Sequence, residues 1–322
     1  YPGVRIYPLD VIDMEDFDDK EFYSSLIKLF KTGINDVEFK NEDANEIKSE
    51  SDNINNDINS SINNTSIGGR TSASYSSELC GVTIDSSQIA NKILFYNFDG
   101  ITPCFSPSRT RSGQIKVELI NGNSWKNVGA VLKITYINFK VTKLSNNNAI
   151  TFNGSKTLKN VNGINWLTFL LSSSNFKFQE RALNIQVAFS DGTQATWNSA
   201  RITTWDYIQA NATPNIPYGY VKFTSNGDTS LNSSQNVDSW GVNRNSQPFK
   251  TYYDAPWISN SYCGFWRPTS GSVKHVVGGA NNLAIELGVD QGGNPSTLPC
   301  AYGFKISWTP FGGTQQVHTL SY

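Results

Sequence analysis

The feature that most constrains the fold is a long series of short apolar or alternating segments after Cys80. Ile93–Phe98 ends at the turn Asp99-Gly100, and Gln114–Ile120 ends at Asn121-Gly122. Period-two alternation is typical of β-strands, and these dipeptides favour tight turns between antiparallel strands. Comparable segments are Ala130–Val141, Ala149–Phe152, Trp166–Leu171, Leu183–Phe189, Gln194–Thr204, Tyr220–Thr224, Gly271–Val277, Leu283–Leu287, Phe304–Trp308 and Gln315–Leu320.

Helical periodicity between these segments, which a parallel α/β fold needs, is missing. The sequence therefore predicts an all-β protein, with an antiparallel β-sandwich-like or elongated sheet body. We expect this body to span residues 80–322, and two sandwich-like halves, 80–210 and 211–322, are one possible arrangement.

The N-terminal part has a different composition. Residues 1–60 carry 15 acidic and 6 basic side chains, although the whole chain is nearly balanced, with 27 acidic and 26 basic residues. Large apolar residues recur at helical spacing in 13–33, acidic residues crowd its start, and Lys28 and Lys31 precede Gly33. These features predict a short helix within an acidic N-terminal arm, residues 1–48.

Residues 49–79 consist almost entirely of Ser, Asn, Asp, Thr, Ile and Gly. A segment with so few apolar side chains buries too little surface to offset the entropy lost on ordering. The sequence therefore predicts a low-complexity linker at 49–79.

Four cysteines allow three disulfide pairings. Their spacing favours Cys80–Cys104 and Cys263–Cys300, each closing a local hairpin. A metal site would need closely paired cysteines or supporting histidines, and the chain has only two histidines. We therefore expect disulfides, no metal and no cofactor, and an extracellular or periplasmic location.

The charge balance and hydropathy exclude two kinds of partner. A net charge of −1 gives no reason to expect nucleic acid. No run approaches the roughly 20 apolar residues of a membrane-spanning helix, so we expect no membrane span.

The β body contains a series of distinctive motifs: Cys80, Cys104, Arg109-Thr110-Arg111-Ser112-Gly113, Ile150–Leu158, Trp197-Asn198-Ser199-Ala200-Arg201-Ile202-Thr203-Thr204-Trp205 and the Cys263-x-x-Trp266 block. In this order they resemble an uncharacterised family of secreted or lipid-anchored β proteins of Bacteroidota. The resemblance covers roughly residues 80–322 and implies export to the cell surface or beyond. Lipid-anchored members begin with a cysteine, whereas this chain begins with Tyr1, so we expect a processed or released protein.

One candidate binding surface lies on the segment Trp197–Trp205. In a strand, Trp197, Arg201 and Trp205 share one face, which predicts either a stacking platform for a sugar or a structural cation–π ladder. Asp191, across the turn at Gly192, is a candidate partner for Arg201.

A second candidate is the densest aromatic cluster in the chain. Loops rich in Tyr and Trp are enriched at interfaces, so this cluster is either a contact surface or packing beneath the second disulfide. Its members are Tyr252, Tyr253, Trp257, Tyr262, Phe265 and Trp266.

The basic pair Arg109 and Arg111 is a third candidate. It would bind an anionic glycan or carboxylate, or it would pair with an acidic residue of the same fold or of the N-terminal arm.

Catalytic residues find little support. His275 and His318 both lie in alternating segments and read as surface residues, so no Ser-His-Asp arrangement is indicated. We therefore expect no enzyme, although a pair of carboxylates such as those of glycosidases would be invisible in sequence.

We expect a structural or adhesive protein at the cell surface, whose N-terminal arm contacts other copies or other surface proteins. The alternatives are a carbohydrate-binding module that takes surface glycans and an accessory subunit of an outer-membrane complex.

Overall fold

The computed structural model describes residues 38–62, 65–68, 79–104, 108–164, 169, 175–230, 236–278, 281–309 and 314–322. Within them lie the α-helix α2 (Glu38–Ile62), a short 3-10 helix η2 (Ile89–Asn91) and fourteen strands. The strands are β1 (Val82–Asp85), β2 (Ile93–Asp99), β3 (Arg109–Asn121), β4 (Val131–Lys143), β5 (Ala149–Asn160), β6 (Asn175–Phe189), β7 (Gln194–Ile208), β8 (Tyr220–Gly227), β9 (Asn236–Val242), β10 (Pro248–Asn260), β11 (Ser270–Val277), β12 (Asn281–Val289), β13 (Gly303–Trp308) and β14 (Gln316–Ser321).

The predicted all-β class is confirmed, and the body is an elongated sheet. All fourteen strands belong to one antiparallel sheet, in which neighbours in sequence are mostly neighbours in space. β8 and β9 occupy the same position in the strand order, because each pairs with β7 on one side and with β10 on the other. Because β7 and β8 pair along Arg201–Ile208, the topology contradicts a division into sandwich-like halves at residue 210.

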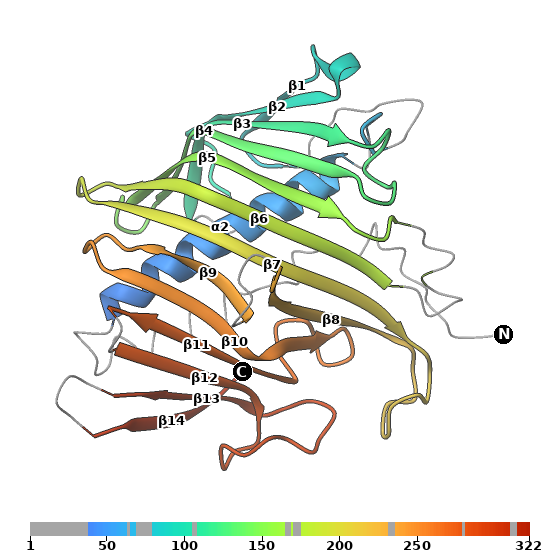
Figure 1. Ribbon diagram of the computed structural model, residues 1–322, viewed down its shortest axis with the longest axis vertical. Helices are drawn as coiled ribbons and strands as arrows, with labels where there is room; N and C mark the ends of the chain where they lie inside the picture. Colours follow the sequence, from blue (N-terminus) through green and yellow to red (C-terminus); the bar gives the residue numbers. More distant parts are fainter. Residues whose placement is uncertain are drawn as a thin grey trace.

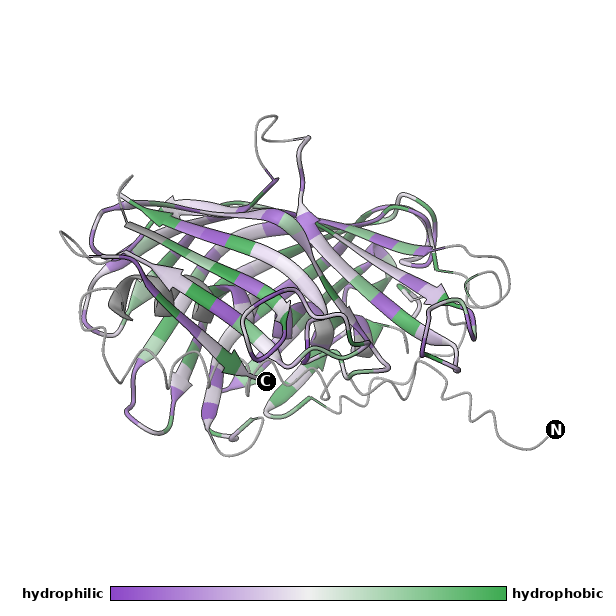
Figure 2. Cartoon of the chain, turned by 90° about the horizontal axis from the view of Figure 1, so that it is seen from below, coloured by the Kyte–Doolittle hydropathy of each residue, from purple (hydrophilic) through white to green (hydrophobic). Residues whose placement is uncertain are grey.

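Two of the bulges in the sheet are centred on asparagines. Asn138 in β4 and Asn184 in β6 have left-handed backbones, with φ of 50° and 57°, and the strand registers shift at both points. Each backbone N–H donates to a neighbouring asparagine side chain, Asn153 and Asn198 respectively, at 2.8 Å. Bulges of this kind increase the local twist and bend of a strand, and Figure 2 shows the resulting curved sheet.

Gly113 in β3 permits the first bulge. A Cβ at this position would lie 2.1 Å from the carbonyl oxygen of Asn138, and its φ is +88°. Only glycine accommodates both this approach and this backbone conformation.

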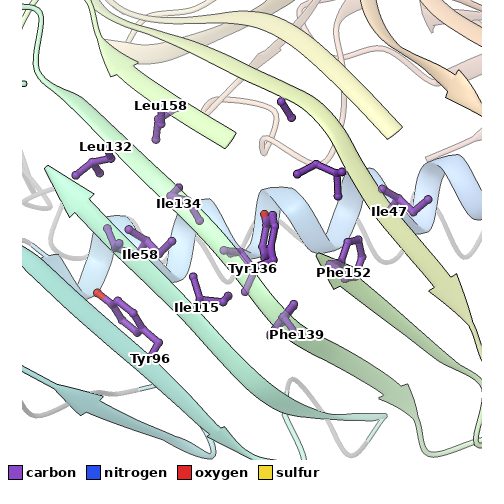
Figure 3. Packing of buried hydrophobic residues seen from close by; sticks show 14 of the residues in the cluster. Ile47, Ile58, Tyr96, Ile115, Leu132, Ile134, Tyr136, Phe139, Phe152 and Leu158 are labelled. Atoms are coloured by element: carbon purple, nitrogen blue, oxygen red, sulfur yellow. The ribbon is translucent and has the colours of Figure 1, made fainter. Parts of the chain in front are cut away.

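The helix α2 crosses the strands on one face of the sheet (Figure 1). We call this the inner face, defined by the residues that contact α2: Tyr96, Arg111, Lys156, Glu180, Arg201 and Tyr253. The helix and the inner face share a hydrophobic core, whose members include Ile47 and Ile58 of α2 and side chains from β2 to β5 (Figure 3).

The inner face continues beyond α2 onto β11–β14. Residues directly opposite in antiparallel strands share a face, and the register aligns Tyr253 with Val273, Ile285, Ile306 and His318. A second hydrophobic cluster lies here and comprises Leu283, Leu287, Phe304, Ile306 and Trp308, with Trp257, Ile285, Leu320 and Tyr322 packed against it.

The position of the helix corrects the predicted domain organisation. Residues 49–62, expected to be a linker, belong to α2, and the helix begins at Glu38. The short helix expected within residues 13–33 lies outside the described residues, as does most of the expected strand Trp166–Leu171. The segment 49–62 is helical because its few isoleucines all fall on the side that meets the sheet.

Candidate functional site: the charged contact between helix and sheet

The isoleucines of α2 form one buried stripe. Ile47, Ile54, Ile58 and Ile62 are separated by seven, four and four residues, which places them on one side of a helix. Each is at most 2% exposed and belongs to the core cluster shared with the sheet. Because Asn, Ser and Asp are poor helix formers, the stability of α2 comes mainly from this packing.

Charged side chains beside the stripe pair with charges on the inner face. Lys48 lies 3.4 Å from Asp238 of β9, and its ammonium also reaches the hydroxyl of Tyr253 at 3.2 Å. One turn further along the helix, both oxygens of Asp52 accept hydrogen bonds from the guanidinium of Arg201 in β7.

Nearer the β1 edge of the sheet, the two arginines of β3 face the helix. Arg109 pairs with Glu50, and Arg111 lies between Asp57, at 2.6 Å, and Glu50, at 3.6 Å. The Arg111 side chain is only 2% exposed. Burial raises the pKa of the Asp57 carboxyl, although the neighbouring Arg111 opposes that shift.

Lys156 and Glu180 form the centre of the contact. The Lys156 ammonium in β5 is fully buried and donates to the Ser51 hydroxyl at 2.6 Å, to the Ser51 carbonyl at 3.0 Å and to Glu180 of β6 at 3.3 Å. The other Glu180 oxygen accepts a hydrogen bond from Ser199 at 3.1 Å, and Asn55 of the helix also donates to this carboxylate.

The carboxylate of Glu180 is charged in the folded protein. Burial alone would favour the neutral acid, but Lys156 and Arg201 outweigh it and hold the pKa at about 2. Burial likewise opposes the charge on Lys156, yet Glu180 keeps the pKa of this lysine above its ordinary value. The two groups therefore form a true ion pair inside the protein.

These contacts make the folded sheet depend on α2. Removing one partner from a buried ion pair leaves an uncompensated charge, which costs several kcal/mol. The inner face places Arg109, Arg111, Lys156 and Arg201 against the helix, and the helix supplies Glu50, Asp52 and Asp57. An inner face without an acidic helix would therefore carry several cations with too few counter-charges.

The Trp197 segment is not an open sugar platform. Trp197 is 2% exposed and lies in the core shared with α2. The Trp205 ring packs against Phe223 and Phe265, at centroid distances of 4.8 and 5.4 Å. Arg201 binds acidic residues of the inner-face contact, so the proposed cation–π ladder is not what fixes it.

Asp191 is not the partner of Arg201. It lies 3.4 Å from Arg244, whose guanidinium also covers the ring of Phe189 at 3.8 Å. Arg109 and Arg111 follow the second alternative left open by the sequence, since both pair with acidic residues of the same fold.

The aromatic cluster of residues 252–266 divides between the inside and the surface. Tyr253 is 2% exposed and faces α2, and Phe265 is buried with Trp205. Tyr252, Trp257 and Trp266 are half-buried, and the ammonium of Lys48 lies 5.9 Å from the Trp257 ring. Tyr262, at 41% exposed, is the most accessible member.

Both predicted disulfides are present. Cys80 is bonded to Cys104 and Cys263 to Cys300.

Among the described residues, no group of three or more His, Cys, Asp or Glu side chains is arranged to hold a metal ion. No helix in this part of the chain is long and apolar enough to cross a membrane.

His275 corrects one expectation. It was expected at the surface, but it is 8% exposed on the inner face, where its ring stacks on Phe249 and its Nδ1 lies 2.8 Å from the Thr251 hydroxyl. Burial lowers its pKa to about 4. His318, by contrast, lies in the exposed part of β14 and stacks on Trp308.

No protein family, curated protein or solved structure matches the chain in the comparisons made with it. The resemblance to secreted proteins of Bacteroidota therefore stays a prediction.

The residues at the centre of the contact were missed in the sequence. Lys156 and Glu180 lie in otherwise ordinary strand segments, and Ser51 and Asp52 lie in the expected linker. One signal was available: the isoleucines from Ile47 to Ile62 recur with the spacing of a helix, with acidic residues between them.

Proposed function

We propose that the protein is a non-enzymatic structural or adhesive component outside the cell, and that it assembles with other copies of itself through its N-terminal region. The carrying observation is the inner-face contact. Residues 38–62 form an acidic helix that pairs with basic side chains of the sheet, and this pairing supports contact between further acidic N-terminal sequence and a sheet.

The two disulfides support a location outside the reducing cytoplasm. The extended single sheet supports a structural role, because open sheets present large surfaces and two edges for contact. Trp197 is buried and Trp205 packs against Phe223, which argues against the sugar-stacking platform considered for these two residues.

Residues 1–37 are the part of the N-terminal region proposed to contact another copy. Like α2, they are acidic, with eight acidic and four basic side chains, and the remaining body carries an excess of basic residues. Opposite net charges in two parts of the chain favour contact between them in solution.

The test is a truncation that ends before α2. A variant lacking residues 1–37 keeps Ile47 and Lys48, whereas a cut after residue 48 would damage the inner-face contact. We expect oligomers or filaments of the non-reduced full chain in light scattering and negative-stain images, and their loss in the truncated variant.

Circular dichroism and thermal unfolding serve as the control, since the truncated variant should keep the sheet signal and unfold within a few degrees of the full chain. A full chain that stays monomeric at 35.7 kDa at every concentration would contradict the proposal. Assembly that is unchanged by the truncation would show that residues 1–37 do not mediate it.

A further inference from the structure

The two edges of the sheet differ in how well they are protected. β1 has only four residues, ends at the charged Asp85 and is followed at once by a turn and η2. β14 has six residues, pairs with β13 without a register shift, and contains no Lys, Arg, Asp, Glu or Pro. Long, regular and uncharged edges are the ones that pair with further strands.

One hydrogen bond shows which residues of β14 direct their backbone groups away from β13. The N–H of Tyr322 donates to the carbonyl of Tyr302, so alternate residues of β14, Leu320 and His318 among them, direct their backbone groups to β13. Val317, Thr319 and Ser321 then direct theirs outward. Val317 is 52% exposed, and Ser321 is exposed as well.

We propose that β14 pairs with β14 of a second copy, antiparallel and centred on Thr319, so that two sheets join into one. The inference rests on the proposed role as a self-assembling building block and names one of its contact surfaces. In this arrangement Val317 lies opposite the partner's Ser321, and Thr319 lies opposite the partner's Thr319.

The chemistry of the strand favours a second copy as the occupant. A strand that pairs with itself meets its own charges, and β14 contains no Lys, Arg, Asp or Glu to repel its counterpart. On the inner face, Leu320 packs on the second hydrophobic cluster and His318 stacks on Trp308. Pairing places His318 opposite the partner's Leu320, so the apolar inner face continues from one copy to the other. About six backbone hydrogen bonds would form between the outward groups.

This contact complements the proposed contact of the arm. A two-fold β14 pair closes on itself and gives only dimers. A second, different contact made by residues 1–37 would link such dimers into longer assemblies.

Two matched double variants test the pairing. V317K/S321K places a lysine opposite a lysine twice in the pair, whereas V317K/S321E places each lysine opposite a glutamate. Both alter the same two exposed positions, whose neighbours in β13, Ser307 and Gly303, are uncharged. Both should therefore fold equally well, which thermal unfolding of each checks.

Sedimentation of the non-reduced full chain over a range of concentrations is the measurement. We expect V317K/S321K to weaken this association at least about tenfold, because like charges directly opposite in paired strands repel. V317K/S321E should still associate, and its association should weaken with added salt.

The outcomes separate this inference from the proposed function. If both double variants assemble like the wild type while truncation of residues 1–37 abolishes assembly, the β14 pairing is overturned and the arm contact stands. If V317K/S321K alone loses association and the truncation has no effect, the pairing stands and the arm contact falls. A wild-type chain that is monomeric at every concentration overturns both.

Discussion

The inner face is built in two different ways. Under α2, apolar side chains of the sheet lie beside buried charges, and the side chains of Lys156 and Glu180 are 0% and 4% exposed. Over β11–β14, the same face is mainly apolar, with the buried His275 among its members. The described ion pairs Lys274–Asp254 and Lys305–Glu286 lie on the opposite face, with side chains 26–45% exposed.

The difference teaches what each region requires. An apolar face accepts any apolar cover, because hydrophobic burial has no direction. A face with buried lysine and arginine accepts only a cover that brings acidic groups to the right positions, because an unpaired buried charge costs several kcal/mol. We infer that the charges under α2 fix the register of the helix on the sheet.

The largest expected effect comes from Glu180→Gln. The substitution keeps the shape of the side chain but leaves Lys156 without its ion-pair partner and removes one of the carboxylates that pair with Arg201. We expect a loss of about 3–5 kcal/mol in the free energy of unfolding. Urea unfolding of non-reduced protein, followed by tryptophan fluorescence, measures it. A loss below about 1 kcal/mol would contradict the claim that the buried charges under α2 require their partners.

The second disulfide should be nearly as important for the C-terminal region. Cys263→Ala with Cys300→Ala opens a loop with a sequence separation of 37. On the chain-entropy estimate the loss is about 3–4 kcal/mol. Urea unfolding measures this loss, and hydrogen exchange should show it as faster opening of β11–β13 than of β4 and β5. Equal acceleration everywhere would show that the two regions unfold as one unit.

The two regions should lose stability in different pH windows. The pKa of His275 is lowered to about 4 in the folded protein, against an ordinary value of 6.5. Protonation therefore favours the unfolded chain, and this contribution is complete above pH 6.5 and disappears as the pH falls toward 4. It amounts to about 3 kcal/mol. His275→Phe should flatten the dependence of unfolding free energy on pH in this window.

Glu180 acts at lower pH. Its folded pKa of about 2 lies below the ordinary value of 4.5, so its contribution is present above pH 4.5 and is lost as the pH falls toward 2. Glu180→Gln should therefore flatten the lower window and leave the upper one unchanged. A variant that flattens both windows would contradict the assignment.

The smallest expected effect comes from Glu286→Gln. It breaks the exposed pair with Lys305 on the outer face, and exposed pairs contribute between zero and about 1 kcal/mol. We therefore expect Glu286→Gln to lower the free energy of unfolding several-fold less than Glu180→Gln does, as measured by urea unfolding. Equal losses for the two variants would mean that burial does not distinguish these glutamates.

The strands and disulfides were predictable because their signals are local. The alternation of Gln114–Ile120 and the turn that follows it need no knowledge of distant residues, and the cysteine spacings favour hairpin closure. The helix was not predictable from propensity, since Asn, Ser and Asp dominate residues 49–62 and ordinarily favour turns. It forms because the sheet covers its isoleucine stripe.

The ion pairs were beyond sequence reasoning for a related reason. Lys156 and Ser51 are 105 residues apart, and Arg201 and Asp52 are 149 residues apart. Nothing in the segments around Lys156 or Arg201 tells which acidic group of the chain they meet. Only the crossing of α2 over β3–β7 brings them together.

Native-state hydrogen exchange of α2 tests the central claim most directly, which is that the helix is part of the core and is held there by buried charges. We predict that the amides of Ile54 and Ile58 open with nearly the same free energy as those of Ile134 in β4, within about 1 kcal/mol. Exchange of the α2 amides at the rate of an unstructured peptide, while Ile134 stays protected, would contradict it.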